Sequence, residues 1–199
     1  MNAVLMSVRP EWCRKIATGE KTIEVRKTAP KMEVPYKVYL YCTDGKTLYR
    51  SAHDGEIRLY RKKAHQAFEH HTVFNCKVWA EFICDADLPL LFACNDPAAL
   101  VTHYEVPGTC LSDVEIMDYF GNGKEGHGLH ISGLKIYGNP RELSEFWRPC
   151  TEYGELGSNC WDCEFCCGDD EVDCCVDGKL FLTRPPQSWC YVEECDTCG

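Results

Sequence analysis

The amino-acid sequence predicts an α+β fold with one principal domain. Several short segments alternate apolar and polar residues with the two-residue period of a β-strand, and helix start and stop signals separate some of them. Hydrophobic residues make up 45% of the 199 residues, and aromatic residues make up 12%. This composition lets the chain bury enough apolar surface to offset the conformational entropy lost on folding. The length suits one ordinary core, or one core with a small appendage.

The chain is expected to begin with a strand followed by a helix. Residues 4–8 are mostly apolar and are typical of a strand. Pro10 occupies a position favoured at the start of a helix, and Gly19 occupies one where helices commonly end. Trp12 and Ile16 then form the buried stripe of this helix.

A second strand is expected over residues 22–26. This segment alternates with a period of two, so Ile23 and Val25 should face the core. Glu24 and Arg26 then share the opposite face, which places two opposite charges side by side.

Residues 37–42 form the next predicted strand, with Tyr39 and Tyr41 on the face opposite Val38 and Leu40. Residues 44–74 follow as an insertion, with a polar hairpin or loop and then a basic helix. The basic cluster, which is typical of a solvated helix face, contains Arg58, Arg61, Lys62 and Lys63.

A strand over residues 76–84 places Val78 and Ala80 on one face and Trp79 and Glu81 on the other. Glu81 is therefore a carboxylate among apolar neighbours. An outward-facing side chain is its simplest interpretation, because Glu is rarely buried without a partner.

Ser112 and Glu115 have the S-x-x-E spacing of a capping box, which predicts a helix start. Ile116, Met117 and Phe120 give this helix its apolar side. The remaining predicted elements are a strand over residues 129–137, a short helix from residue 139 that carries Leu143, Phe146 and Trp147, and a last strand over residues 188–193.

The first residues contain no basic leader, and the apolar run ends at Arg9 and Pro10. This run is too short for a signal peptide or a membrane span. We therefore expect a cytoplasmic protein with no membrane partner.

The charge of the chain is divided unevenly along its length. Residues 1–80 carry a formal charge of +7, residues 81–199 carry −17, and the whole chain carries −10. A positive half attracts phosphates, but the overall negative charge disfavours coating of a long polyanion. A short or single nucleotide ligand is easier to reconcile with this pattern. Ordinary solvated surface remains the alternative.

The segments SVRPEW at residues 7–12 and GEKTIEVR at residues 19–26 carry a resemblance to a known family. Together with HIS at residues 130–132 and PPQSW at residues 185–189, they resemble the ASCH family of bacteria and prophages. The resemblance implies a PUA-like β-barrel with flanking helices. The resemblance covers roughly residues 3–147 and 184–194. We therefore divide the chain into an ASCH core over residues 1–147, a Cys-rich segment over 148–183 whose cysteine spacing predicts zinc binding, and a closing strand with the C-terminal tail over 184–199.

The resemblance also implies a cleft around Lys21 that binds RNA or a nucleotide. The candidate ligand-binding residues are Arg9, Trp12, Lys21, Glu24, Arg26, His130, Ser132 and Trp189. The aromatic members, with Tyr39 and Tyr41, could stack on a base, although a place in the core is the alternative.

One similar group of ASCH proteins hydrolyses N4-acetylcytidine with the Lys of this segment, a Thr three residues later and a Glu from elsewhere. Lys21 matches that lysine, but Glu24 stands in the place of the threonine. If the protein is a hydrolase of this kind or a ribonuclease, the catalytic candidates are Lys21, Glu24 and Glu81. The substitution at Glu24 favours binding over amide hydrolysis. The alternative is that this segment has no function, in which case Lys21, Glu24 and Arg26 form a set of ion pairs on the surface of a strand.

Cysteine is the compositional outlier, with 16 residues, of which 10 lie in residues 150–198. Pairs separated by two residues present thiolates to a tetrahedral zinc ion, so we expect one structural zinc in this segment. The expected ligands are Cys160, Cys163, Cys166 and Cys174. Disulfides or redox chemistry are the alternative. The segment is also acidic, so it could bind a protein partner.

Overall fold

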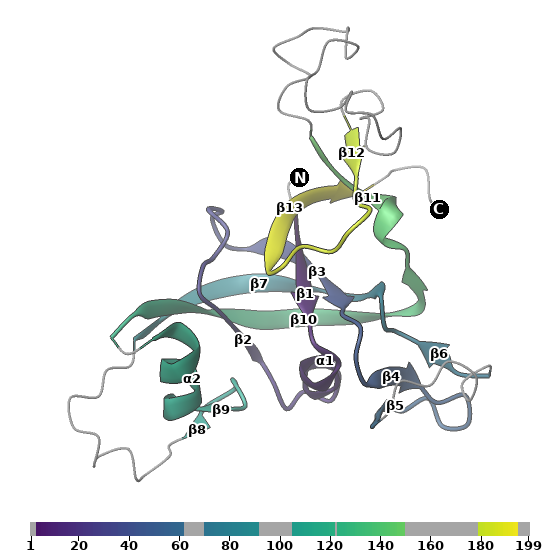
Figure 1. Ribbon diagram of the computed structural model, residues 1–199, viewed down its shortest axis with the longest axis horizontal. Helices are drawn as coiled ribbons and strands as arrows, with labels where there is room; N and C mark the ends of the chain where they lie inside the picture. Colours follow the sequence, from purple (N-terminus) through teal and green to yellow (C-terminus); the bar gives the residue numbers. More distant parts are fainter. Residues whose placement is uncertain (1–2, 62–69, 92–104, 122, 150–178, 195–199) are drawn as a thin grey trace, which may run out of the picture.

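The computed structural model describes residues 3–61, 70–91, 105–121, 123–149 and 179–194, and it confirms the α+β prediction (Figure 1). The described part contains one eight-stranded mixed sheet in the order β12-β11-β13-β1-β3-β7-β10-β2. Its strands are β1 (Ala3–Val8), β2 (Ile23–Arg26), β3 (Tyr36–Cys42), β7 (Lys77–Leu91), β10 (Glu125–Arg141), β11 (Phe146–Pro149), β12 (Lys179–Phe181) and β13 (Trp189–Glu194).

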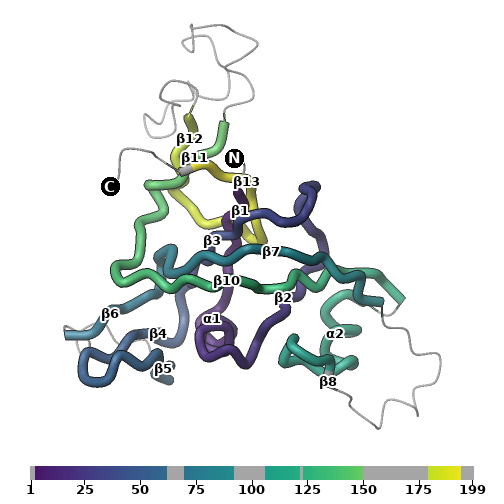
Figure 2. The backbone as a smooth tube through the Cα atoms, turned by 180° about the vertical axis from the view of Figure 1, so that it is seen from behind, coloured from purple at the N-terminus to yellow at the C-terminus, as the bar shows by residue number. Residues whose placement is uncertain are grey.

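Smaller elements surround this sheet. They are helix α1 (Pro10–Ala17), the sheet of β4 (Thr47–Arg50), β5 (Ile57–Tyr60) and β6 (Thr72–Val73), the pair β8 (Glu105–Val106) and β9 (Leu111–Ser112), helix α2 (Asp113–Phe120), and the 3-10 turn η3 (Leu143–Glu145). Figure 2 shows α1 between the β4–β5–β6 sheet and α2. Among the described residues there is no helix with the length and hydrophobicity that a membrane crossing requires.

The large sheet curves so that its edge strand β2 comes back to β1 and β13. The guanidinium Nη2 of Arg26 on β2 donates to the carbonyl oxygen of Ser7 on β1 at 2.7 Å. Just beyond β2, the carbonyl oxygen of Thr28 accepts from the indole Nε1 of Trp189 on β13 at 3.0 Å. Side-chain hydrogen bonds therefore bridge the edge strand to the middle of the sheet.

The alternation predicted for residues 37–42 is confirmed. Val38 and Leu40 pack in one core cluster with Val4, while Tyr39 and Tyr41 pack in a second cluster. Both faces of β3 are covered, and the two tyrosines belong to the core. Their alternative assignment as exposed stacking platforms for a base is wrong.

Strand β7 departs from the predicted alternation because it contains a bulge. Leu40 is opposite Ala80, but Tyr41 is opposite Val78, so Trp79 has no partner on β3. An extra residue turns the following side chains to the other face. Val78 consequently packs in the cluster of Tyr41, and Trp79 packs with Ala80.

Helix α2 begins with the predicted capping box. The hydroxyl of Ser112 accepts from the Glu115 backbone N–H, and Oε2 of Glu115 accepts from the Ser112 backbone N–H at 2.8 Å. Ile116 and Phe120 are buried against Val25 of β2. The apolar side of α2 therefore holds this helix beside the edge strand.

Two predicted helical segments are different in the structure. Arg58 lies in strand β5, so the basic helix does not include it, and residues 62–69 lie outside the described ranges. Phe146 and Trp147 belong to strand β11, which follows the single turn η3. Pairing of Trp147 with β12 and β13 stabilises the strand there.

The last predicted strand is observed as β13, which pairs antiparallel with β1. The division of the chain at residues 147 and 183 stays a prediction, because residues 150–178 lie outside the described part.

Candidate binding pocket

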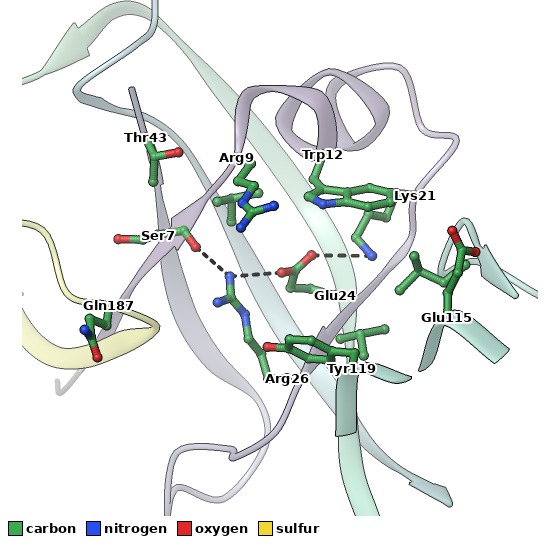
Figure 3. A pocket seen from close by; sticks show the side chains of 13 residues that line it. Ser7, Arg9, Trp12, Lys21, Glu24, Arg26, Thr43, Glu115, Tyr119 and Gln187 are labelled. Carbon is green, nitrogen blue, oxygen red and sulfur yellow. Dashed lines mark hydrogen bonds and ion pairs between the residues drawn. The ribbon is translucent and has the colours of Figure 1, made fainter. Parts of the chain in front are cut away.

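A pocket of about 530 Å³ lies where the edge strand β2 meets the end of β1 and the start of α1 (Figure 3). It is lined by Ser7, Val8, Arg9, Trp12, Lys21, Glu24, Val25, Arg26, Thr43, Leu111, Glu115, Tyr119 and Gln187. The structure thus brings together five of the eight residues that the sequence nominated for ligand binding.

The chain reaches the pocket floor through a tight turn after α1. Gly19 has a φ of +75°, in the left-handed region that favours glycine, and it follows the helix end as predicted. The backbone N–H groups of Thr22 and Ile23 then donate to the carbonyl oxygen of Gly108 at 2.8 and 2.9 Å. A Cβ at Gly108 would lie 2.5 Å from Oγ1 of Thr22, so this close approach requires glycine.

Lys21, Glu24 and Arg26 form a buried ion cluster on the pocket floor. The Lys21 Nζ lies 3.5 Å from Oε2 of Glu24, and Arg26 Nη2 lies 2.9 Å from Oε1 of the same carboxylate. All three side chains are less than 10% exposed. The interpretation of these residues as an exposed set of ion pairs is therefore wrong. Two cations share one anion, which leaves an excess positive charge in the pocket.

Lys21 is held by more than its carboxylate partner. Its Nζ donates to the carbonyl oxygen of Thr109 at 2.9 Å. Glu24 contacts Lys21 as well as Arg26, so its pairing with Arg26 does not release Lys21. An ammonium has three donors, so one donor of Lys21 remains for a ligand. Among the described residues, Nε of Arg26 is also buried with no hydrogen-bond partner.

Burial lowers the pKa of Lys21 below the ordinary value for lysine, because a charged ammonium is poorly solvated in the pocket floor. Attraction to the Glu24 carboxylate acts in the opposite direction without cancelling the effect of burial. Lys21 can therefore give up its proton more readily than a surface lysine.

Two aromatic side chains stand on opposite sides of the ion cluster, as Figure 3 shows for Trp12 and Tyr119. Trp12 comes from α1, and its ring centroid lies 5.2 Å from Nζ of Lys21. Tyr119 comes from α2 and is 42% exposed. Tyr119 is not among the residues nominated from the sequence, where its local signal is an aromatic ring outside the apolar side of a predicted helix. Nothing local shows that α2 packs against β2.

Three nominated ligand residues lie away from the pocket lining. His130 is exposed on β10, where its Nδ1 lies 2.6 Å from Oδ1 of Asp85. Ser132 donates to the carbonyl oxygen of Ile83 at 3.0 Å. Trp189 is bound to Thr28 by its indole nitrogen. The contacts of His130 and Ser132 join β10 to β7, and the contact of Trp189 joins β13 to the segment after β2.

Glu81 also lies away from the pocket lining. Its carboxylate accepts from the hydroxyl of Tyr137 at 2.6 Å and contacts Lys135 at 3.3 Å. Burial acts to raise its pKa, but these two neighbours together with Lys37 lower it below the usual range. Glu81 is therefore an ionised carboxylate in a separate polar cluster, and the structure does not bring it to Lys21.

The nominated zinc ligands Cys160, Cys163, Cys166 and Cys174 lie outside the described residues. The six cysteines in the described part are free thiols. Within that part there is no group of three or more His, Cys, Asp or Glu side chains that could hold a metal ion. The zinc site stays a prediction.

No family model and no curated protein sequence matches this chain. Solved structures that resemble it include the ASCH protein from Zymomonas mobilis, at 16% identity and a TM-score of 0.46 over 96% of this chain and 87% of that one. Two single-residue mutants of the same protein give TM-scores of 0.47 at 16% and 15% identity, covering 96% of this chain and 90% and 88% of theirs. This likeness concerns the fold alone.

Proposed function

We propose that the pocket binds one nucleotide, either free or as part of an RNA chain. The observation that carries this proposal is the pair of buried cations, Lys21 and Arg26, on the single carboxylate of Glu24. A buried excess of positive charge is costly unless an anion compensates it. A phosphate group supplies that charge and accepts from the remaining donors of both side chains.

The walls of the pocket suit the other end of a nucleotide. Trp12 offers a ring face on which any base can stack, since every base has a π-face. The volume of about 530 Å³ lies within the range of about 300–1,000 Å³ that is usual for small-molecule sites. Arg9 adds a third cation to the lining, which also contains the carboxylates of Glu24 and Glu115, so the lining keeps a net positive charge. Charge and aromatic surface are therefore combined in one hollow.

Isothermal titration calorimetry with the four nucleoside 5′-monophosphates tests this function. We expect the wild type to bind at least one of these nucleotides and the Lys21→Met variant to bind it more weakly. Lys135→Met is the matched control, because Lys135 is 69% exposed and contacts Glu81 away from the pocket lining. Arg9→Gln is a second pocket variant that leaves the buried ion cluster intact. Lack of binding by the folded wild type would contradict the proposal.

The lowered pKa of Lys21 favours a second candidate function, hydrolysis of an N4-acylated cytidine. In this reaction the neutral amine of Lys21 takes a proton from water, and the hydroxide attacks the acyl carbon. The C–N bond of the resulting tetrahedral intermediate then breaks, the acyl group leaves as a carboxylic acid, and the exocyclic nitrogen of cytidine takes the proton that Lys21 accepted from water. Release of cytidine from N4-acetylcytidine, lost in Lys21→Met and kept in Lys135→Met, supports it. Binding of the compound without turnover contradicts it.

A further inference from the structure

A lysine lies over each of the two aromatic rings of the pocket. The Nζ of Lys15 is 4.9 Å from the ring centroid of Trp12, and the Nζ of Lys27 is 5.0 Å from that of Tyr119. The two rings line the pocket from opposite sides of the ion cluster (Figure 3). Each side of the pocket therefore has an ammonium group beside its aromatic wall.

Within the described part of the chain these two lysines form no close ion pair, although Lys15 attracts the Glu20 carboxylate at longer range, whereas neighbouring cations do form close pairs. Arg14, next to Lys15 on α1, contacts Glu20 at 2.9 Å. Lys46 contacts Glu11, also on α1, at 2.8 Å. Lys15 and Lys27 contact rings and make no ion pair there. Their charges are thus available to an anion from outside.

Neither Lys15 nor Lys27 is among the residues that line the pocket, so each ammonium group lies beside an aromatic ring of the lining and outside the lining itself. Their side chains are flexible, so the ammonium groups can turn toward a phosphate of a strand whose base stacks in the pocket. The phosphates of the two neighbouring nucleotides in such a strand would compensate both charges.

We infer that the pocket takes an internal nucleotide of a single-stranded nucleic acid, with its own phosphate at the Lys21–Arg26 cluster and the phosphates of its two neighbours in the strand at Lys15 and Lys27. This inference rests on the proposed nucleotide-binding function. A free mononucleotide has its phosphate at the Lys21–Arg26 cluster, so it leaves both Lys15 and Lys27 without a phosphate partner. A duplex keeps its bases stacked and paired, so it does not present one to the pocket.

Binding of a single-stranded RNA pentamer and of a nucleoside monophosphate, each measured at several salt concentrations, tests the inference. A plot of the logarithm of the binding constant against the logarithm of the salt concentration has a negative slope. Each phosphate contact on a single strand makes that slope steeper by about 0.7. We expect the pentamer to bind more tightly, with a slope steeper by roughly 1.4 for two added contacts. Lys15→Gln and Lys27→Gln should each remove about 0.7 of this slope, whereas the control Lys135→Gln should keep all of it.

Both single variants should also bind the mononucleotide as the wild type does. Equal affinity and slope for the pentamer and the mononucleotide would overturn the inference and leave the proposed function standing. An unchanged slope in the Lys15→Gln/Lys27→Gln double variant, or equal affinity for a duplex of the same sequence, would also overturn it. Absence of binding by both probes would contradict the proposed function itself.

Discussion

The ammonium of Lys21 lies 3.5 Å from a carboxylate oxygen of Glu24, and the two side chains are only 3% and 8% exposed. The other oxygen of Glu24 lies 2.9 Å from Arg26. One carboxylate therefore compensates two buried cations. This arrangement makes Glu24 the residue on which the pocket floor depends most strongly.

Replacement of Glu24 by Gln should lower the free energy of unfolding by about 3–5 kcal/mol, because two buried cations lose the one carboxylate that pairs with them among the described residues. Lys21→Met should cost less, since it leaves Glu24 and Arg26 as a balanced pair. Urea denaturation measures both effects. Glu20→Gln is the control, because the pair of Glu20 with Arg14 is exposed. A loss in Glu24→Gln no larger than in Glu20→Gln would show that the cluster is not buried in solution.

Lys21 should lose its proton at a lower pH than lysine ordinarily does, because burial lowers its pKa. The unfolded chain, with a lysine pKa of about 10.4, then binds more protons in the window between the two pKa values. The free energy of unfolding should therefore rise with pH in that window, and Lys21→Met should remove this rise. NMR titration of the Lys21 Cε resonance, assigned from its loss in Lys21→Met, measures its pKa. A midpoint at or above the ordinary lysine value of about 10.4 would contradict this prediction.

Removal of the Ser112 hydroxyl should destabilise helix α2 and, with it, the wall of the pocket that carries Tyr119. Ser112→Ala is expected to cost about 0.5–2 kcal/mol, the usual loss for an N-cap. Ser112→Asp keeps an oxygen acceptor and should retain most of the stability. Thermal unfolding of the two variants measures the difference. Equal midpoints for Ala, Asp and wild type would mean that the capping box does not hold α2.

We propose a structural zinc held by Cys160, Cys163, Cys166 and Cys174. Protein purified under reducing conditions without chelator should contain about one zinc per chain. The double variant Cys160→Ser/Cys163→Ser should lose the metal. Cys76→Ser should keep it, because Cys76 lies in the described part of the chain outside any metal group. A zinc content well below one per chain in the wild type would contradict this proposal.

Elements whose signals are local could be predicted from the sequence. Pro10 and Gly19 mark the ends of the first helix region, and Ser112 with Glu115 marks the start of α2. The two-residue period of β3 correctly separated its tyrosines from Leu40. In each case the determining contacts join residues that are close in sequence.

The departures arise where distant segments decide the structure. The bulge at Trp79 depends on how β7 pairs with β3, and it reverses the face of Val78. Phe146 and Trp147 have helical neighbours in sequence, but they pair with Glu193, Glu194 and Phe181 in the sheet. Local periodicity contains no information about these partners.

The pocket follows the same division. Arg9, Trp12, Lys21, Glu24 and Arg26 come from one stretch of sequence and could be nominated together. Thr43, Tyr119 and Gln187 join them only because the sheet curves and α2 packs against β2. The burial of the ion cluster is also a property of this assembly, so its charges could not be distinguished from a surface set by sequence alone.

The most direct test of the pocket is the NMR response of the Trp12 indole to a nucleotide. Its N–H resonance can be assigned from its loss in Trp12→Phe, and the Trp147 indole on β11 serves as an internal control. On titration with a nucleoside monophosphate, we predict a saturable shift at Trp12, none at Trp147, and a weakened response in Lys21→Met. A saturable response elsewhere in the protein with the Trp12 resonance unmoved would contradict nucleotide binding in this pocket.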